Sequence, residues 1–225
     1  MTADSFNHPS SEPPAPVRSD AERCDDWESL ECLYQAFPST HAQRRAWRAA
    51  STAVRMALLT RGHLGWPALI PGLVHARLAT ALLAAGYRRQ ADLARSRFLC
   101  LGCHAGLEVR ILRDFGAADA MGLEIRGEVV DEGLRSGLIR PGEVATADFW
   151  DFLTASADPS WDDILLLAPQ QIALGKLWQA ARGRLAPHGH LVAVAQASDL
   201  TDLPADVVDG PALEDTMRWY VLTNG

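Results

Sequence analysis

The chain has 225 residues, of which 48% are hydrophobic and 22% are charged, and its formal net charge at pH 7 is −7. This composition is that of an ordinary globular protein, and no apolar run approaches the roughly 20 residues that a bilayer span requires. The negative charge opposes sequence-independent attraction to phosphate backbones, so we expect neither a membrane nor a nucleic-acid partner.

The start of the chain is rich in proline and serine and nearly free of aliphatic side chains. Such a segment cannot bury enough apolar surface to offset the entropy of ordering, so residues 1–20 are predicted to be a disordered tail. The segment also lacks the basic region and apolar core of a secretory signal. We therefore expect a cytoplasmic protein whose four cysteines are reduced.

Residues 21–96 are predicted to form an N-terminal helical cap, because apolar side chains recur there at helical spacing. Thr40 and Gln43 have the spacing of a capping box, and the prolines and glycines of 62–72 predict a loop. The expected helices are 21–37, 40–62 and 73–85.

A strand, a glycine turn and a helix follow the cap. The apolar run Phe98–Leu101 breaks at Gly102, reaches Gly106 and continues as a helical pattern. This arrangement aims the first backbone N–H groups of the helix at an anionic or nucleotide-like group beyond the strand. A second apolar run ends at Glu124, about 20 residues on, where doubly wound folds hold a ribose diol.

The rest of the chain alternates short apolar runs with helical patterns, which predicts parallel strands joined by right-handed crossovers. Residues 97–225 are therefore expected to form an α/β domain with a doubly wound, mostly parallel Rossmann-like sheet. The expected strands are 97–101, 119–124, 143–147, 163–167, 190–195 and 218–223. The expected helices are 105–115, 126–136 and 170–184. One further strand is either missing or lies near 206–208.

Five segments, in this order, resemble the class I S-adenosylmethionine-dependent methyltransferases. The glycine motif of that family is similar to LCLGCHAGLEVRIL (99–112), and its second motif is similar to MGLEI (121–125). Its third motif resembles 147–149, its fourth strand resembles 161–169, and its turn into strand five resembles 184–192.

The resemblance implies that S-adenosylmethionine is the cofactor and that a small molecule accepts its methyl group. It also implies that the N-terminal cap closes over the cofactor and shapes the substrate pocket; the alternative is that the cap only covers the sheet edge or makes a homodimer contact. The residues implied to hold the cofactor are Gly102, Cys103, His104, Gly106, Glu124, Ile125, Asp148, Phe149 and Ala168. In this family Glu124 would meet the ribose and Asp148 the adenine amino group. Asp148 is also placed to cap a helix that begins at Phe149, and Phe149 or Trp150 either stacks on adenine or is plain core.

The chain departs from the family pattern at two positions. Cys100 stands where the family has an acidic residue on its first strand, and His104 stands at the middle glycine of the loop. His104 is either a ligand contact or proton-transfer group, or a plain turn residue. Gln170 is the other catalytic candidate, although an amide orients a substrate rather than acting as a base.

The stretch from Cys100 to His104 also spells C-x-x-C-H, the attachment signature of c-type haem. Because Cys100 lies in an apolar strand, we expect two small buried thiols instead, and no metal site.

Three functions remain open from the sequence. Methyl transfer is the leading hypothesis, because it needs alignment and desolvation rather than a fixed catalytic triad. In the second, the cofactor's own amine, without a carboxylate at position 100, attacks the cofactor's γ-carbon and releases methylthioadenosine and a cyclic amino acid. In the third, the chain is a degenerate methyltransferase fold that serves as a binding module, although Glu124 and Asp148 argue against it.

Overall fold

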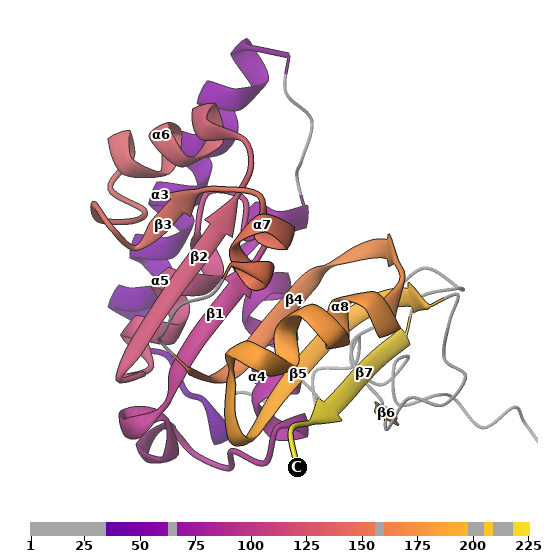
Figure 1. Ribbon diagram of the computed structural model, residues 1–225. Helices are drawn as coiled ribbons and strands as arrows, with labels where there is room; N and C mark the ends of the chain where they lie inside the picture. Colours follow the sequence, from indigo (N-terminus) through magenta and orange to yellow (C-terminus); the bar gives the residue numbers. More distant parts are fainter. Residues whose placement is uncertain (1–34, 63–66, 156–159, 198–204, 209–217) are drawn as a thin grey trace, which may run out of the picture.

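The computed structural model describes residues 35–62, 67–155, 160–197, 205–208 and 218–225. The predicted tail and nearly all of the predicted helix 21–37 lie outside these ranges. Within them the chain forms a seven-stranded sheet in the order β3-β2-β1-β4-β5-β7-β6, with helices on both faces (Figure 1). No helix in the described ranges has the length and apolar character that a membrane crossing needs.

The strands agree closely with the sequence pattern. They are β1 Arg97–Leu101, β2 Asp119–Glu124, β3 Val144–Thr146, β4 Trp161–Ile172, β5 Leu185–Ala197, β6 Ala205–Val208 and β7 Arg218–Thr223. Only β7 runs antiparallel to its neighbours, β5 and β6. The uncertain strand near 206–208 therefore exists, as β6 at the sheet edge.

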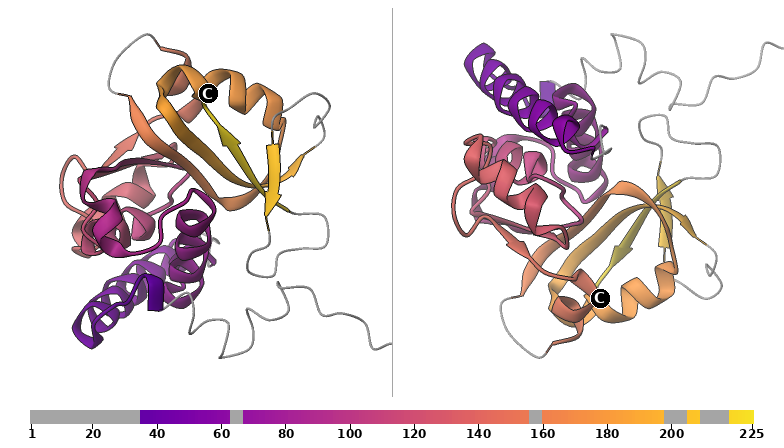
Figure 2. Two further views of the ribbon diagram at one scale, coloured as in Figure 1. Left: turned by 90° about the horizontal axis from the view of Figure 1, so that it is seen from below. Right: turned by 90° about the horizontal axis from the view of Figure 1, so that it is seen from above.

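Helices cover the two faces of the sheet in two groups (Figure 2). The first group is α3 His41–Thr60, α4 Pro71–Ala84, α5 Leu107–Asp114 and α6 Gly127–Arg135; the second is α7 Phe149–Thr154 and α8 Leu174–Ala181. Short 3₁₀ turns are η1 Pro67–Leu69, η2 Gln90–Arg95 and η3 Arg182–Arg184. Side chains of β1 alternate between the faces, so that Phe98 and Cys100 pack toward the first group while Leu99 and Leu101 pack toward the second.

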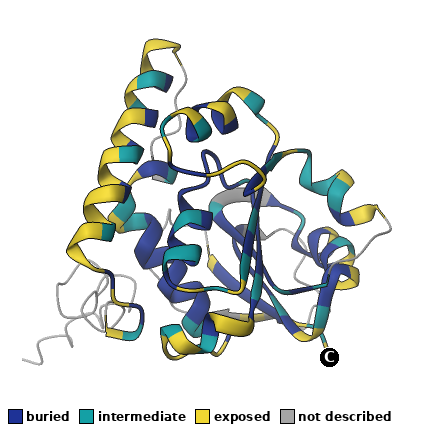
Figure 3. Cartoon of the chain, turned by 90° about the vertical axis from the view of Figure 1, so that its left-hand side faces the viewer, coloured by how far each residue is buried: buried dark blue, intermediate teal, exposed yellow. Residues whose placement is uncertain are grey.

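The helical cap shares its hydrophobic core with the sheet. Trp47 and Val54 of α3 and Leu78 of α4 belong to the same buried cluster as Phe98 of β1 and Val194 of β5. Helix α4 is apolar on all sides and correspondingly buried, whereas α3 keeps a long exposed outer face (Figure 3). The capping box of Thr40 and Gln43 is present as predicted.

Several predicted boundaries are wrong. Strand β5 begins at Leu185 rather than at residue 190, and α8 ends at Ala181 rather than at residue 184. Two further differences lie at prolines. Pro71 is the first residue of α4 rather than part of the preceding loop, because proline fits the first helical turn, where no N–H partner is needed. Strand β4 continues to Ile172, where the sequence predicted a helix from residue 170. The register against β5 shifts between Leu166 and Gln170, so Pro169 lies in a bulge rather than at a strand end.

Candidate functional site

A cavity of about 550 Å³ lies at the carboxyl ends of the central strands, where the strand order reverses between β1 and β4. Its lining comes from the loops after β1, β2 and β3, from the bulge of β4 and from the cap. The lining residues are Ala68, Val74, Arg77, Gly102, His104, Glu108, Leu123, Glu124, Ile125, Arg126, Asp148, Phe149, Trp150 and Ala168. The cap thus shapes the cavity through η1 and α4.

The glycine loop after β1 is held in left-handed backbone conformations. Its φ angles are 60° at Gly102, 54° at His104 and 87° at Gly106. A side chain at Gly106 would also place its Cβ 2.5 Å from Ile139 and 2.8 Å from Val144, so this glycine is required by packing. Cys103 is buried beneath the loop, and neither Cys103 nor Gly106 lines the cavity.

Glu124 links the loop to the end of β2. Its Oε2 accepts a hydrogen bond from the backbone N–H of His104 at 3.0 Å, and its Oε1 accepts two from Arg126, at 3.1 Å from the backbone and 2.8 Å from Nε. Burial acts to raise the pKa of Glu124, but the hydrogen bonds from Arg126 hold it below its usual range. A carboxylate offers about four acceptor positions, so one remains for a ligand hydroxyl.

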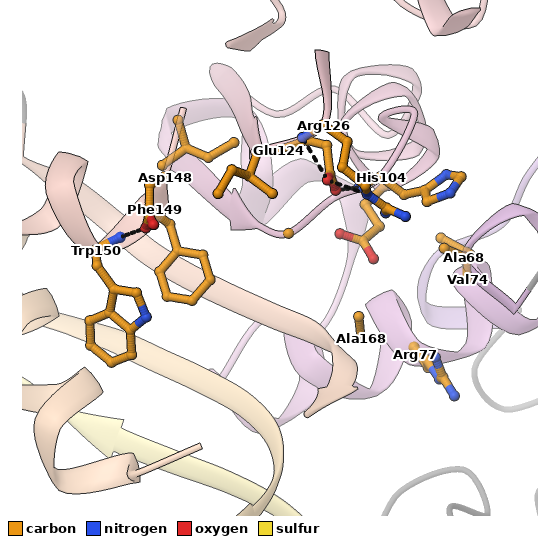
Figure 4. Close-up of a pocket in the computed structure, with 14 residues that line it drawn as sticks. Ala68, Val74, Arg77, His104, Glu124, Arg126, Asp148, Phe149, Trp150 and Ala168 are labelled. Atoms are coloured by element: carbon orange, nitrogen blue, oxygen red, sulfur yellow. Dashed lines mark hydrogen bonds and ion pairs between the residues drawn. The ribbon is translucent and has the colours of Figure 1, made fainter. Parts of the chain in front are cut away.

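One end of the cavity is aromatic (Figure 4). Asp148 caps α7, its Oδ1 accepting from the Trp150 backbone N–H at 2.7 Å, as the sequence predicted. The rings of Phe149 and Trp150 are 5.2 Å apart between centroids, and Lys176 lies 4.8 Å from the centre of the Trp150 ring. Phe149 lines the cavity and is only half-buried, which suits stacking against a flat, apolar ring.

The other end carries buried polar groups that lack partners. Arg77, His104 and Glu108 are 9%, 4% and 5% exposed, yet Arg77 Nε, His104 Nδ1 and Glu108 Oε2 have no hydrogen-bond partner. Arg77 makes one long hydrogen bond, 3.4 Å from Nη1 to the Leu167 carbonyl in the β4 bulge. In Figure 4 the His104 ring lies on the side of Ala68 and Val74, across the cavity from Asp148.

Burial sets the charge states at this end. It lowers the pKa of His104 to about 4, with Arg126 adding to the effect, so the imidazole is neutral at pH 7. Burial raises the pKa of Glu108 to about 8, while the nearby Arg77 opposes the rise. Glu108 is therefore mostly protonated at pH 7.

Sequence reasoning found half of the lining but missed several charged groups. Seven of the residues implied to hold a cofactor surround the cavity: Gly102, His104, Glu124, Ile125, Asp148, Phe149 and Ala168. Gln170 lies in β4, and its side chain falls outside the described part of the chain. Arg77, Glu108 and Arg126 were missed, although Arg77 is conspicuous as the one arginine in the apolar helix α4.

The thiols of Cys100 and Cys103 are free and buried, as expected. Burial raises the pKa of each well above its ordinary value, so neither is a thiolate at pH 7. No group of three or more His, Cys, Asp or Glu side chains within the described ranges is arranged to hold a metal ion.

Comparison of the fold with solved structures finds methyltransferases. An RNA methyltransferase from Salinibacter ruber, solved with S-adenosylhomocysteine, is 22% identical, with a TM-score of 0.45 over 65% of this chain and 88% of that one. The N-methyltransferase NodS from Bradyrhizobium japonicum is 17% identical, with a TM-score of 0.45 over 64% and 93%. An S-adenosylmethionine-dependent methyltransferase from Mesorhizobium loti is 22% identical, with a TM-score of 0.40 over 53% and 54%.

The similarity is one of fold. No protein-family model and no curated protein matches the chain in sequence. Overlaps of this extent do not define an activity, which has to follow from the residues of the cavity.

Proposed function

We propose that the chain is an S-adenosylmethionine-dependent enzyme that transfers the methyl group to a small molecule. The observation that carries the proposal is that the glycine loop, Glu124 at the end of β2 and the Asp148–Trp150 segment all line the same cavity. S-adenosylmethionine supplies an electrophilic methyl group on a sulfonium.

The lining fits that molecule from end to end. The aromatic end offers Phe149 for a purine ring, while the cap of α7 uses Oδ1 of Asp148 and leaves Oδ2 for an amino group. The free acceptor position of Glu124 suits a ribose hydroxyl. The unpartnered polar atoms at the opposite end suit the amino acid portion of the molecule.

The two catalytic candidates, His104 and Gln170, suit holding and aligning reactants rather than proton transfer. Burial lowers the pKa of His104 to about 4, which makes its imidazole a weak base, and Gln170 of β4 carries an amide, which is not a base. Transfer to an acceptor that is already nucleophilic requires only positioning and exclusion of water, and a cavity lined in part by the cap supports both. A small acceptor is favoured by the net charge of −7, which opposes binding to RNA or DNA.

Calorimetric titration with S-adenosylhomocysteine tests the cofactor assignment. We expect binding by the wild type and a loss of about tenfold or more in Asp148→Ser, because serine retains the helix cap but removes the second carboxylate oxygen. Asp131→Ser, on the exposed face of α6, is the matched control. Absence of binding by the wild type would put the binding-module alternative first.

Mass spectrometry of the protein incubated with S-adenosylmethionine then identifies the reaction. S-adenosylhomocysteine formed only in the presence of a small acceptor supports methyl transfer. Methylthioadenosine formed without an acceptor would overturn it in favour of cyclisation of the cofactor, and methylation of added RNA alone would overturn the small-molecule assignment.

A further inference from the structure

The charged end of the cavity holds a guanidinium and a carboxyl group that do not pair with each other. Arg77 comes from α4 and Glu108 from the first turn of α5, and both line the cavity. They interact electrostatically, but no ion pair joins these two side chains. Each is more than nine-tenths buried and keeps one polar atom without a partner.

Leaving such atoms unpartnered is costly for the empty protein. A buried polar group without a hydrogen bond loses its hydration and gains nothing in return, and charged groups lose most. Unpartnered buried polar atoms are exceptions in folded proteins, and titratable groups with a shifted pKa cluster at functional sites. The guanidinium therefore suits an anionic group of a ligand, and the carboxyl oxygen suits a hydrogen-bond donor such as an ammonium.

We infer that Arg77 and Glu108 form a subsite for a zwitterionic α-amino acid head group, with Arg77 binding its carboxylate and Glu108 binding its ammonium. The inference rests on the proposed function, in which this head group is the amino acid end of S-adenosylmethionine. Arginine suits a carboxylate because its planar guanidinium donates two parallel hydrogen bonds.

Glu108 also accounts for the departure at Cys100. The Cys100 thiol is fully buried and neutral, so strand β1 supplies no negative charge to the cavity. Glu108 supplies a carboxyl group from the following helix, eight positions further along the chain. The acidic function has moved from the strand to the helix rather than disappeared.

Filling the subsite changes the protonation of Glu108. The titratable and charged groups around it hold fixed states near pH 7 to 8: cationic Arg77 and Arg126, anionic Glu124, and neutral His104, Cys100 and Cys103. A ligand ammonium beside Glu108 favours its carboxylate form, so binding at pH 7 releases up to about one proton. Calorimetry in buffers with different ionisation enthalpies measures that proton.

Three adenosine thioethers that differ at the amino acid end test the assignment. They are S-adenosylhomocysteine, its decarboxylated analogue S-adenosyl-3-thiopropylamine, and 5′-methylthioadenosine, which has no head group. In Glu108→Gln we expect affinity for the first two to fall by about 10- to 100-fold, with methylthioadenosine unchanged. In Arg77→Met we expect affinity to fall for S-adenosylhomocysteine alone, because only this ligand carries a carboxylate.

Matched variants show whether a fall in affinity comes from the subsite or from a loss of folding. Arg45→Met and Asp131→Asn change exposed residues outside the cavity and should leave all three affinities unchanged. Unchanged affinity of the variants for methylthioadenosine shows an intact cavity; if Arg77→Met fails to fold, Arg77→Lys takes its place, since lysine lacks the two-point contact.

The outcomes separate this inference from the proposed function. If all adenosine compounds bind and neither variant discriminates among them, the subsite is overturned while the cofactor assignment stands. If both variants bind S-adenosylhomocysteine normally but bind an amino acid acceptor weakly, the head group belongs to the acceptor, which also overturns it. If no adenosine compound binds to the wild type, the proposed function itself fails.

Discussion

Glu108 makes the stability of the empty protein depend on pH. Burial raises its pKa to about 8, from 4.5, so the folded state retains a proton that the unfolded chain has released. The free energy of unfolding therefore falls as the pH rises through that window. We expect Glu108→Gln to remove this pH dependence. At pH 8.5 the free energy of unfolding of the variant should exceed that of the wild type by about 1–3 kcal/mol.

Urea denaturation between pH 7 and pH 9 measures this difference. This range avoids the titration of His104. Its pKa is about 4 in the folded state and 6.5 in the unfolded chain, so His104 lowers the free energy of unfolding only below about pH 6.5. Glu128→Gln, on the exposed surface of α6, should follow the wild type. Equal pH slopes in wild type and Glu108→Gln would show that Glu108 is already ionised in the empty cavity.

At the scale of residues, local pattern identified some site groups and hid others. Glu124 and Asp148 follow apolar strands, where a carboxylate in a doubly wound fold faces the ligand edge. Glu108 is in the first turn of a helix, a position that carboxylates commonly take to offset the helix dipole. Only the burial of that turn beneath α4, a long-range contact, distinguishes Glu108 from an ordinary surface residue.

At the scale of elements, the contact between β2 and the glycine loop tolerates no extra atoms. A Cβ at Gly122 would lie 2.3 Å from Sγ of Cys103 and 3.0 Å from a methyl group of Val109. We expect Gly122→Ala to destabilise the protein by about 1–3 kcal/mol through overpacking. Gly72→Ala, in α4 with nothing within 4 Å, should instead stabilise by about 0.5–1 kcal/mol.

Chemical denaturation of a double variant isolates that contact. Cys103→Ala removes the sulfur atom, so Gly122→Ala should cost less in its presence than in the wild type. If the losses of stability from the two substitutions are simply additive, the strand itself, rather than the contact with Cys103, accounts for the cost of the added methyl group.

The sequence predicts which helices and strands exist more completely than it predicts where each one begins and ends. Alternation of apolar runs located β1, β2 and β7 to the residue, because each is bounded by polar or turn residues. The extension of β4 to Ile172 was missed, since the bulge at Pro169 is stabilised by pairing of β4 with β5 and by Arg77, neither of which is local. The start of α4 was missed because Pro71 was interpreted as a loop residue.

At the scale of the whole molecule, the cap and the sheet are joined by polar links as well as by the shared core. Trp47 of α3 donates from Nε1 to Oδ2 of Asp114, at the end of α5, at 2.6 Å. Tyr87, between α4 and β1, donates to Oδ2 of the fully buried Asp163 in β4 at 2.5 Å, and His190 of β5 lies 2.8 Å from the other oxygen. Cap and sheet should therefore unfold together.

A single substitution in the cap tests this cooperativity. Leu78 of α4 is fully buried in the common cluster, so Leu78→Ala should lower stability by about 2–5 kcal/mol throughout the structure. Hydrogen exchange at increasing urea concentrations, followed on peptides from α4, β1 and β4, should show equal losses in all three. Leu59→Ala, at a position 45% exposed on α3, should change the stability very little. A loss confined to α4 peptides would mean that the cap opens separately, and because Arg77 lies on α4, such an opening would also expose the charged end of the cavity.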